Sequence, residues 1–169
     1  MRMIALLAAV AACQPDTAPP PEPVTMTEDA LGYFCQMNIA DHGGPKGQIH
    51  LKGLPQPLFF PQVRDLVAYL KGPEREADIT AVYVTDMGVA PSWAFPGNDN
   101  WTLAETAVFV VDAGVRGGMG APEIVPFADR QAAQEFIARY GGTPMSLNEI
   151  PDDAALGPVD LDAELEDPK

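Results

Sequence analysis

The sequence predicts an α+β fold in which two ββαβ units pack as one small two-lobed domain. Short apolar segments, typical of strands, surround two amphipathic helical patterns. Each helical pattern follows two predicted strands and precedes a third. The two halves also align at a constant offset of 67 positions, which pairs Phe60, Leu66, Tyr69 and Leu70 with Phe127, Ala133, Phe136 and Ile137.

The first unit is expected to span about 30–88. Its helix is bounded by Pro61, which suits a first helical turn, and by Gly72, which favours termination. The glycine- and proline-rich turn before residue 47 separates two apolar stretches. The predicted elements are strands over 33–39, 47–53 and 78–86 and a helix over 61–72.

The second unit is expected to span about 101–150. Its helix has an apolar face that includes Ala133 and Phe136, and Gly141 is expected to end it. The predicted elements are strands over 105–112, 123–127 and 144–150 and a helix over 128–142. The connection, 87–101, contains both tryptophans and is expected to lie against the core.

The N-terminus has the pattern of an exported lipoprotein. Arg2 precedes an apolar run too short to span a bilayer, which is typical of a signal peptide over 1–12. Val10-Ala11-Ala12-Cys13 resembles a bacterial lipobox, so we expect Cys13 to be lipidated. Such a protein would be attached on the periplasmic side of a bacterial membrane, and Gln14 after the cysteine mildly favours the outer membrane. The alternative is an ordinary signal peptide that happens to contain a cysteine.

The regions outside the two units are rich in proline and acidic residues. We expect a flexible tether over 13–29, a folded domain over 30–150 and a disordered acidic tail over 151–169. The 169 residues carry a formal net charge of -14. Such a surface repels phosphate groups, which argues against nucleic acid as a partner and is compatible with cations or basic protein surfaces.

Cys35 and Met37 form a candidate soft-metal site. If Cys13 carries lipid, Cys35 is the only remaining thiol, in an oxidising compartment where an unprotected thiol is a liability. In an extended segment the two side chains would point to the same face. A thiolate together with a thioether favours Cu(I), whereas zinc usually takes four nitrogen or thiolate donors. The alternative is a half-buried cysteine beside a core methionine.

Two longer motifs carry a family resemblance. The first, FCQMNIADHGGPKGQI at 34–49, contains Phe34, Cys35, Met37, Ile39, Asp41, His42, Gly44, Pro45, Lys46, Gln48 and Ile49 at the family's positions. The second, MGAPEIVPFADRQAAQEFIARYGG, covers 119–142. Together, in this order and behind a lipobox, they resemble the NosL family of copper-binding lipoproteins.

The resemblance implies a fold, a function and a ligand set. Members are similar to the small domain of organomercurial lyase and deliver Cu(I) for the copper-sulfide centre of nitrous oxide reductase. The implied partners are that reductase or its membrane-bound maturation complex, and the protein would not be an enzyme. Carried over to this chain, the copper ligands are Cys35, Met37 and Met119.

Further residues near these motifs have open roles. His42 is a ligand or a supporting residue whose ring Asp41 could orient by a hydrogen bond. Met87 is a reserve thioether, and His50 is expected at the surface. Two other functions remain open. One is a cysteine-dependent lyase or hydrolase with Cys35 as nucleophile, and the other is a structural lipoprotein with an inert thiol.

Overall fold

The computed structural model describes residues 19–160 and 164–168. The predicted signal peptide, 1–12, and the predicted lipidation site, Cys13, lie outside these residues. Within the two described ranges, no helix is long and apolar enough to cross a membrane.

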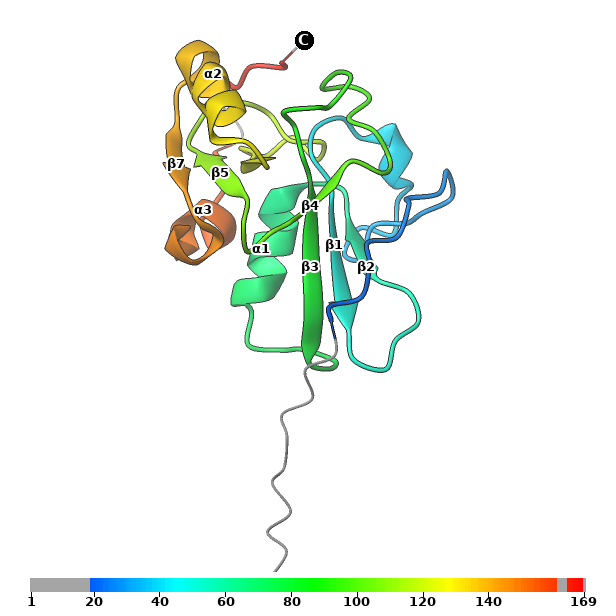
Figure 1. The fold of residues 1–169 in the computed structure, drawn as a ribbon. Coiled ribbons are helices and arrows are strands. Elements are labelled where there is room, and N and C mark those ends of the chain that lie inside the picture. The colour runs from blue at the N-terminus through cyan, green and yellow to red at the C-terminus, as the bar shows by residue number, and fades with distance from the viewer. Residues whose placement is uncertain (1–18, 161–163, 169) are drawn as a thin grey trace, which may run out of the picture.

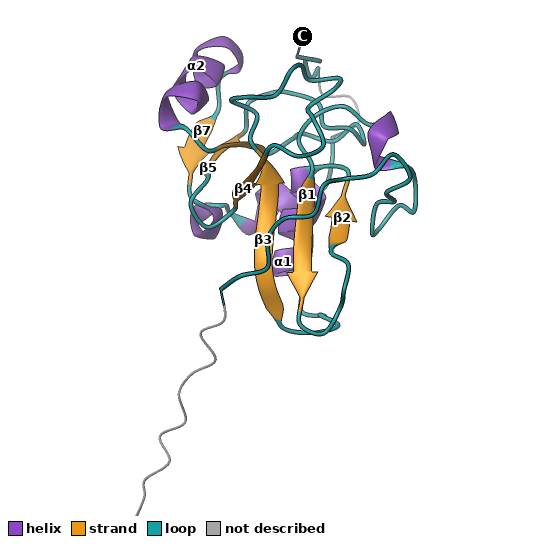
Figure 2. Ribbon diagram, turned by 45° about the vertical axis from the view of Figure 1, so that its right-hand side comes forward, coloured by secondary structure: helices purple, strands orange, loops and turns teal. Residues whose placement is uncertain are grey.

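A four-stranded antiparallel sheet forms the first lobe (Figures 1 and 2). Its elements are β1 (Gly47–Leu51), β2 (Leu58–Phe60), α1 (Val63–Lys71), β3 (Ile79–Thr85) and β4 (Trp101–Leu103). The strand order is β2-β1-β3-β4, with the connection 87–100 leading into the added edge strand β4. Without β4, the chain order is ββαβ, as predicted.

The second lobe repeats this topology with a three-stranded antiparallel sheet. Its elements are β5 (Val108–Val111), β6 (Val125–Phe127), α2 (Arg130–Tyr140) and β7 (Thr143–Met145). The order β6-β5-β7 matches β2-β1-β3 of the first sheet. Strands β2 and β6, like helices α1 and α2, begin 67 positions apart. The predicted α+β fold of two ββαβ units is therefore confirmed.

The helix ends have local causes. Asp129 caps α2 by accepting hydrogen bonds from the backbone N–H groups of Gln131 and Ala132, which would otherwise lack partners. Gly141 ends the helix with φ 72°, a conformation that glycine adopts without a steric cost. The N–H of Gly72 likewise donates to carbonyls of the last turn of α1. Both predicted stops are confirmed.

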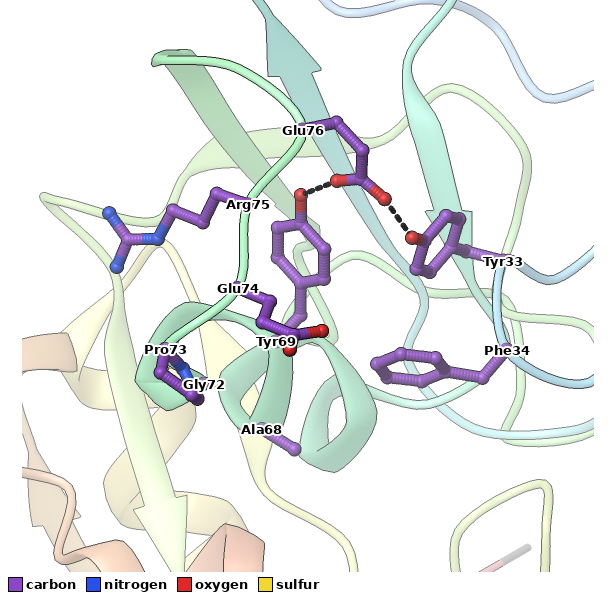
Figure 3. A pocket seen from close by; sticks show the side chains of 9 residues that line it. All are labelled: Tyr33, Phe34, Ala68, Tyr69, Gly72, Pro73, Glu74, Arg75 and Glu76. Carbon is purple, nitrogen blue, oxygen red and sulfur yellow. Dashed lines mark hydrogen bonds between the residues drawn. The ribbon is translucent and has the colours of Figure 1, made fainter.

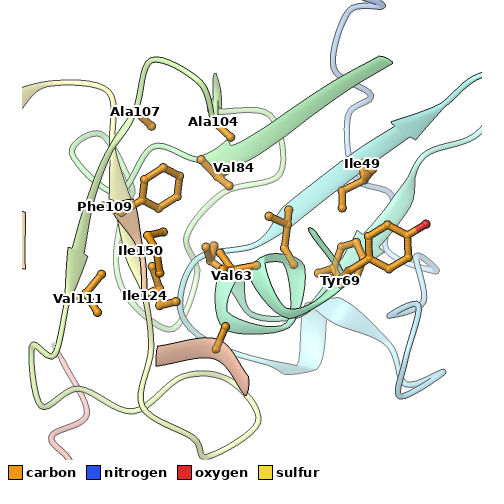
Figure 4. Close-up of a cluster of buried hydrophobic side chains, with 14 of the residues drawn as sticks. Ile49, Val63, Tyr69, Val84, Ala104, Ala107, Phe109, Val111, Ile124 and Ile150 are labelled. Atoms are coloured by element: carbon orange, nitrogen blue, oxygen red, sulfur yellow. The ribbon is translucent and has the colours of Figure 1, made fainter. Parts of the chain in front are cut away.

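The two lobes share one hydrophobic core built around α1 (Figure 4). Ile49 and Val84 of the first sheet and Phe109 and Ile124 of the second lobe belong to this one cluster, together with residues of α1 such as Val63. A smaller cluster packs beneath α2, where the Trp93 ring stacks on Phe136 with centroids 6.4 Å apart. The predicted packing of the tryptophan-containing connection against the core is thus confirmed for Trp93.

Two predicted strands are wrong in detail. The segment 33–39 is a closed turn that leads into a short 3-10 helix, η1 (Ile39–Asp41), instead of a strand. The first strand of the unit is therefore β1, within the predicted strand 47–53, and the second is β2, which was not predicted. The final strand, predicted over 144–150, ends at Met145 and is followed by a 3-10 helix, η2 (Leu147–Glu149). Short apolar segments do not reveal by periodicity whether a neighbouring strand is available for pairing.

The described part of the acidic tail is docked, which differs from the expected disorder. Helix α3 (Asp152–Leu156) packs on α1, and its carboxyl end is held by a hydrogen bond from the Arg64 guanidinium to the Gly157 carbonyl. Farther on, Glu166 pairs with the loop after β5 through backbone hydrogen bonds to Gly114 and Arg116. These contacts join distant parts of the chain, so local composition could not predict them.

The last part of the predicted tether also lies on the domain. Val24 exchanges two hydrogen bonds with the Gln48 side chain, and the Tyr83 hydroxyl donates to the Pro21 carbonyl. This places the segment on the face of the sheet opposite α1, because Gln48 alternates with core residue Ile49. His50 on that face is buried against Gln48 and Tyr83, so its predicted surface position is wrong.

Candidate metal centre

Cys35 lies in a tight turn that closes on itself. The Gly32 N–H donates to the Met37 carbonyl at 2.9 Å, and the Gln36 N–H donates to the Gly32 carbonyl at 2.8 Å. Gln36 takes φ 56°, a left-handed conformation that non-glycine residues adopt at a cost. Its side-chain amide helps to hold this conformation by donating to the Tyr33 carbonyl at 2.8 Å.

The turn brings the Cys35 sulfur next to Met37. The Met37 N–H points at the Cys35 Sγ across 3.5 Å. Cys35 is a free, half-buried thiol, whereas 43% of Met37 is exposed. The two residues therefore lie together through a closed turn, and the strand alternation from which their proximity was predicted does not exist.

His42 is held by the loop that carries Met119. Its Nδ1 lies 2.9 Å from the Gly118 carbonyl, which can only accept, so Nδ1 is the donor and, in the neutral tautomer that this bond selects, Nε2 carries the lone pair. That Nε2 is buried and has no hydrogen-bond partner among the described residues. The Gly118 carbonyl therefore orients the ring, a role that was predicted for the exposed Asp41.

The Met119 loop packs tightly against the turn after η1. A Cβ on Gly118 would lie 2.7 Å from both the Gly43 carbonyl oxygen and the His42 Cβ, so only glycine fits. The Met119 N–H donates to Gln62 Oε1 at 3.1 Å, which anchors the loop to the start of α1. Met119 is 38% exposed, so this loop leaves the residue accessible to solvent.

Pro61 is the neighbour that the two motifs share. A Cβ built on Gly32 would contact both the Cys35 Sγ at 2.7 Å and the Pro61 ring at 3.1 Å. On the Met119 side, a Cβ on Gly118 would lie 3.2 Å from the Pro61 carbonyl oxygen. The Cys35 turn and the Met119 loop thus approach the same residue, immediately before α1. We call the edge formed by Cys35, Met37 and Met119 the sulfur edge.

Lys46 is a buried support for this region that the sequence did not reveal as such. Its Nζ donates to the carbonyls of His42, Gly43 and Pro61 at 2.5, 2.8 and 3.0 Å. Burial lowers the pKa of Lys46 to about 8, although a coulombic contribution from Glu123 acts in the opposite direction. A single ammonium group therefore joins the turn after η1 to the segment before α1.

Glu123 is buried behind the Met119 loop. Its Oε1 accepts from the N–H groups of Arg64 at 3.0 Å and Ile124 at 2.9 Å, while Oε2 has no partner among the described residues. Gly117 leaves space for this carboxyl group, since a Cβ there would lie 2.6 Å from Oε2. Burial raises the pKa of Glu123 to about 8, so the group is mostly protonated at neutral pH.

The raised pKa of Glu123 makes stability depend on pH. Its folded pKa of about 8 exceeds the ordinary value of 4.5, so its contribution to the free energy of unfolding is lost as pH rises between these values. Relative to Glu123→Gln, the native protein should lose on the order of 2 kcal/mol between pH 5.5 and 7.5. Urea unfolding of both proteins at the two pH values measures this. A difference between them that does not change with pH would contradict the assignment.

Met87, the reserve ligand, packs partly buried against the cluster under α2. Its N–H donates to the Pro126 carbonyl at 3.0 Å. Contacts with the core therefore account for its position.

No group of three His, Cys, Asp or Glu side chains that could hold a metal gathers in the described part of the chain. The candidate donors carried by these turns and loops are the Cys35 thiol, the thioethers of the exposed Met37 and Met119, and the His42 imidazole, a set of donor types that suits Cu(I).

Comparison with known proteins places these motifs in one family. The sequence profile of the NosL family matches residues 23–155. The copper-binding lipoprotein NosL of Achromobacter cycloclastes is 48% identical over 161 residues, which cover 95% of this chain and 83% of that protein. The copper-binding lipoprotein NosL of Stutzerimonas stutzeri is 31% identical over 130 residues, which cover 76% of this chain and 66% of that protein.

Solved structures agree with the sequence match. The crystal structure of the copper chaperone NosL from Shewanella denitrificans superposes with a TM-score of 0.72 at 33% identity, covering 78% of this chain and 97% of that one. The solution structure of apo-NosL from Achromobacter cycloclastes gives a TM-score of 0.51 at 48% identity, and the match covers 72% of this chain and 97% of that one. The likeness to organomercurial lyase stays a prediction. The profile, the relatives and the structures agree that this chain belongs to the NosL family.

Proposed function

We propose that the protein is a lipid-anchored Cu(I) chaperone that delivers copper for the copper-sulfide centre of nitrous oxide reductase, and that it is not an enzyme. Its relatives are named copper-binding lipoprotein and copper chaperone. The lipobox at Cys13 supports an anchor on the periplasmic side, with a weak preference for the outer membrane. The reductase, or its membrane-bound maturation complex, is the proposed receiver because of the family resemblance.

The observation that carries this proposal is the sulfur edge. Cys35 is a half-buried thiol in the same turn as the exposed Met37, and the loop of the exposed Met119 approaches the residue that this turn also approaches, Pro61. Thiolate and thioether donors favour Cu(I) over harder cations. A site at an exposed edge also suits transfer, because incoming ligands can reach the ion and displace the original donors one at a time.

The proposed ligands are Cys35, Met37 and Met119. His42 is the available nitrogen donor, since its Nδ1 bond to Gly118 leaves the Nε2 lone pair free. The same bond gives His42 a positioning role, because it joins the turn after η1 to the loop that carries Met119. Loss of this bond would therefore alter the position of Met119 even if His42 does not bind copper.

The test is a competition titration with a Cu(I) chelator. The native chain should bind one Cu(I), and Met119→Leu should weaken this binding by about tenfold, since leucine keeps the volume but lacks the sulfur. X-ray absorption should show one sulfur neighbour fewer in the variant. Met145→Leu, in β7, is the matched control and should leave affinity and sulfur count unchanged.

Two results would contradict the proposal. Failure of the native chain to compete for Cu(I) would remove the chaperone function. Equal sulfur counts in the native chain and Met119→Leu would exclude Met119 as a ligand and leave His42 Nε2 as the next candidate for the third position.

A further inference from the structure

A cavity of about 460 Å³ opens beside the Cys35 turn (Figure 3). It lies between this turn and the segment that follows α1, and it is distinct from the sulfur edge. Tyr33 and Phe34 contribute from the turn, Tyr69 from the helix, and Glu74 and Glu76 from the segment after it. We call this cavity the aromatic pocket.

Three aromatic rings form its walls. The Tyr33 ring lies 5.2 Å from that of Phe34 and 5.6 Å from that of Tyr69, between ring centroids. Phe60 supports Phe34 from the core side, at 5.7 Å in an edge-to-face arrangement. Phe34 nevertheless remains 53% exposed. A large aromatic ring held in place but open to solvent is available for contact with a ligand or a partner.

A carboxylate is fixed at one end of the pocket. One oxygen of Glu76 accepts from the Tyr33 hydroxyl, and the other accepts from the Tyr69 hydroxyl at 2.5 Å (Figure 3). These hydrogen bonds lower the pKa of Glu76, so it is negatively charged at neutral pH. Burial and the bond to Glu76 raise the pKa of Tyr69 to about 12, so its hydroxyl remains a donor. A carboxylate can accept about four hydrogen bonds, so Glu76 keeps capacity for a further donor.

The cation already present in this segment does not satisfy the carboxylate. The Arg75 guanidinium donates to the Leu70 carbonyl at 2.7 Å, and its side chain points away from Tyr33 and Phe34 (Figure 3). Glu74 adds a second carboxylate to the lining. The formal net charge of -14 further increases the local concentration of cationic partners. The pocket therefore combines aromatic faces, a positioned anion and an overall negative field.

We propose that the aromatic pocket accepts an arginine side chain of the protein that receives the copper. A planar guanidinium can stack on the Phe34 ring while its N–H groups donate to the Glu76 carboxylate, a combination that a lysine ammonium does not match. Tyr33 and Phe34 immediately precede Cys35, so an arginine bound here would hold the partner next to the sulfur edge. The identity of the partner rests on the proposed function, whereas arginine binding itself does not.

Arginine binding is tested on the copper-free chain with two small probes. N-acetyl-arginine amide carries the guanidinium, and N-acetyl-citrulline amide is its neutral analogue of nearly the same shape. In a ¹³C NMR titration, the arginine probe should give saturable shifts of the Phe34, Tyr33 and Tyr69 ring signals at millimolar concentration. The citrulline probe should give none that saturate. Equal responses to both probes would overturn the proposal.

Variants locate the binding to the pocket. Glu76→Gln removes the charge with little change of shape and should weaken arginine binding by about tenfold. Phe34→Leu, at a half-exposed position, should also weaken it, through loss of the aromatic face. Glu105→Gln, at an exposed glutamate outside the pocket, is the matched control and should bind like the native chain.

The outcomes separate this proposal from the chaperone function. Saturable arginine binding by a chain that takes up no Cu(I) would support the pocket and refute the chaperone. Copper binding by a chain that does not bind the arginine probe would refute the pocket proposal and leave the chaperone function intact. Loss of arginine binding in Glu105→Gln as large as in Glu76→Gln would show a general charge effect and overturn the assignment to the pocket.

Discussion

Replacement of Cys35 with serine is expected to lower the affinity for Cu(I) at least about 100-fold. The thiolate is the one anionic donor of the proposed site, and a serine hydroxyl is a harder, neutral donor at the same position. Because Cys35 lies in a turn held by backbone hydrogen bonds and is only half-buried, the fold should tolerate the change. Chelator competition measures the affinity, and urea unfolding checks the fold.

The same variant tests delivery. In a denitrifying host in which this chain is the only copy, Cys35→Ser should leave nitrous oxide reductase without its copper-sulfide centre, visible in the absorption spectrum of the purified enzyme. Native affinity in the variant would refute Cys35 as a ligand. A fully loaded reductase beside a chaperone that binds no copper would refute the delivery role.

Replacement of Lys46 with methionine is expected to lower the free energy of unfolding by about 3 kcal/mol. Methionine fills much of the volume of the lysine stem but leaves the carbonyls of His42, Gly43 and Pro61 without their shared donor. Each buried polar group that loses its partner costs about 1–3 kcal/mol, which outweighs the desolvation of the ammonium that is relieved. Urea unfolding measures the loss.

Lys71→Met is the matched control. Lys71 forms an ion pair with Asp152 at 2.7 Å, and the Asp152 side chain is 80% exposed. Such a pair is expected to contribute about 0–1 kcal/mol. Losses of equal size in the two variants would contradict the supporting role of Lys46. Cu(I) affinity should fall only in Lys46→Met. The hydrogen bonds from Lys46 hold the turn after η1 against Pro61, the residue that the Cys35 turn and the Met119 loop both approach.

Cys35 itself bears on the two other functions considered. An inert structural thiol is expected to be buried, whereas Cys35 is half-buried beside an exposed methionine. A nucleophile would need a base in contact with it, whereas the hydrogen bond that Cys35 Sγ accepts among the described residues comes from the Met37 backbone N–H. These placements favour the soft-metal proposal over a lyase, a hydrolase or a purely structural lipoprotein.

Elements with local signals could be predicted from the order of residues alone. Helices α1 and α2 have complete apolar faces and terminating glycines, so their positions follow from 3.6-residue periodicity and capping. The constant offset of 67 positions predicted the repeated ββαβ topology before any strand pairing was known. The Cys35 and Met37 pair was recognisable as a candidate soft-metal site from its residue types, and the family resemblance of the two motifs implied Met119 as the third ligand.

The contacts that hold these residues in place became visible in the folded chain. The turn around Cys35, the His42–Gly118 bond and the Lys46 support depend on backbone carbonyls, which every residue carries and no sequence pattern distinguishes. The packing of α3 on α1, and the assembly of the aromatic pocket from residues before β1 and after α1, likewise depend on contacts between segments far apart in the chain. Such contacts form because the folded core fixes their partners in space, so local residue preferences cannot specify them.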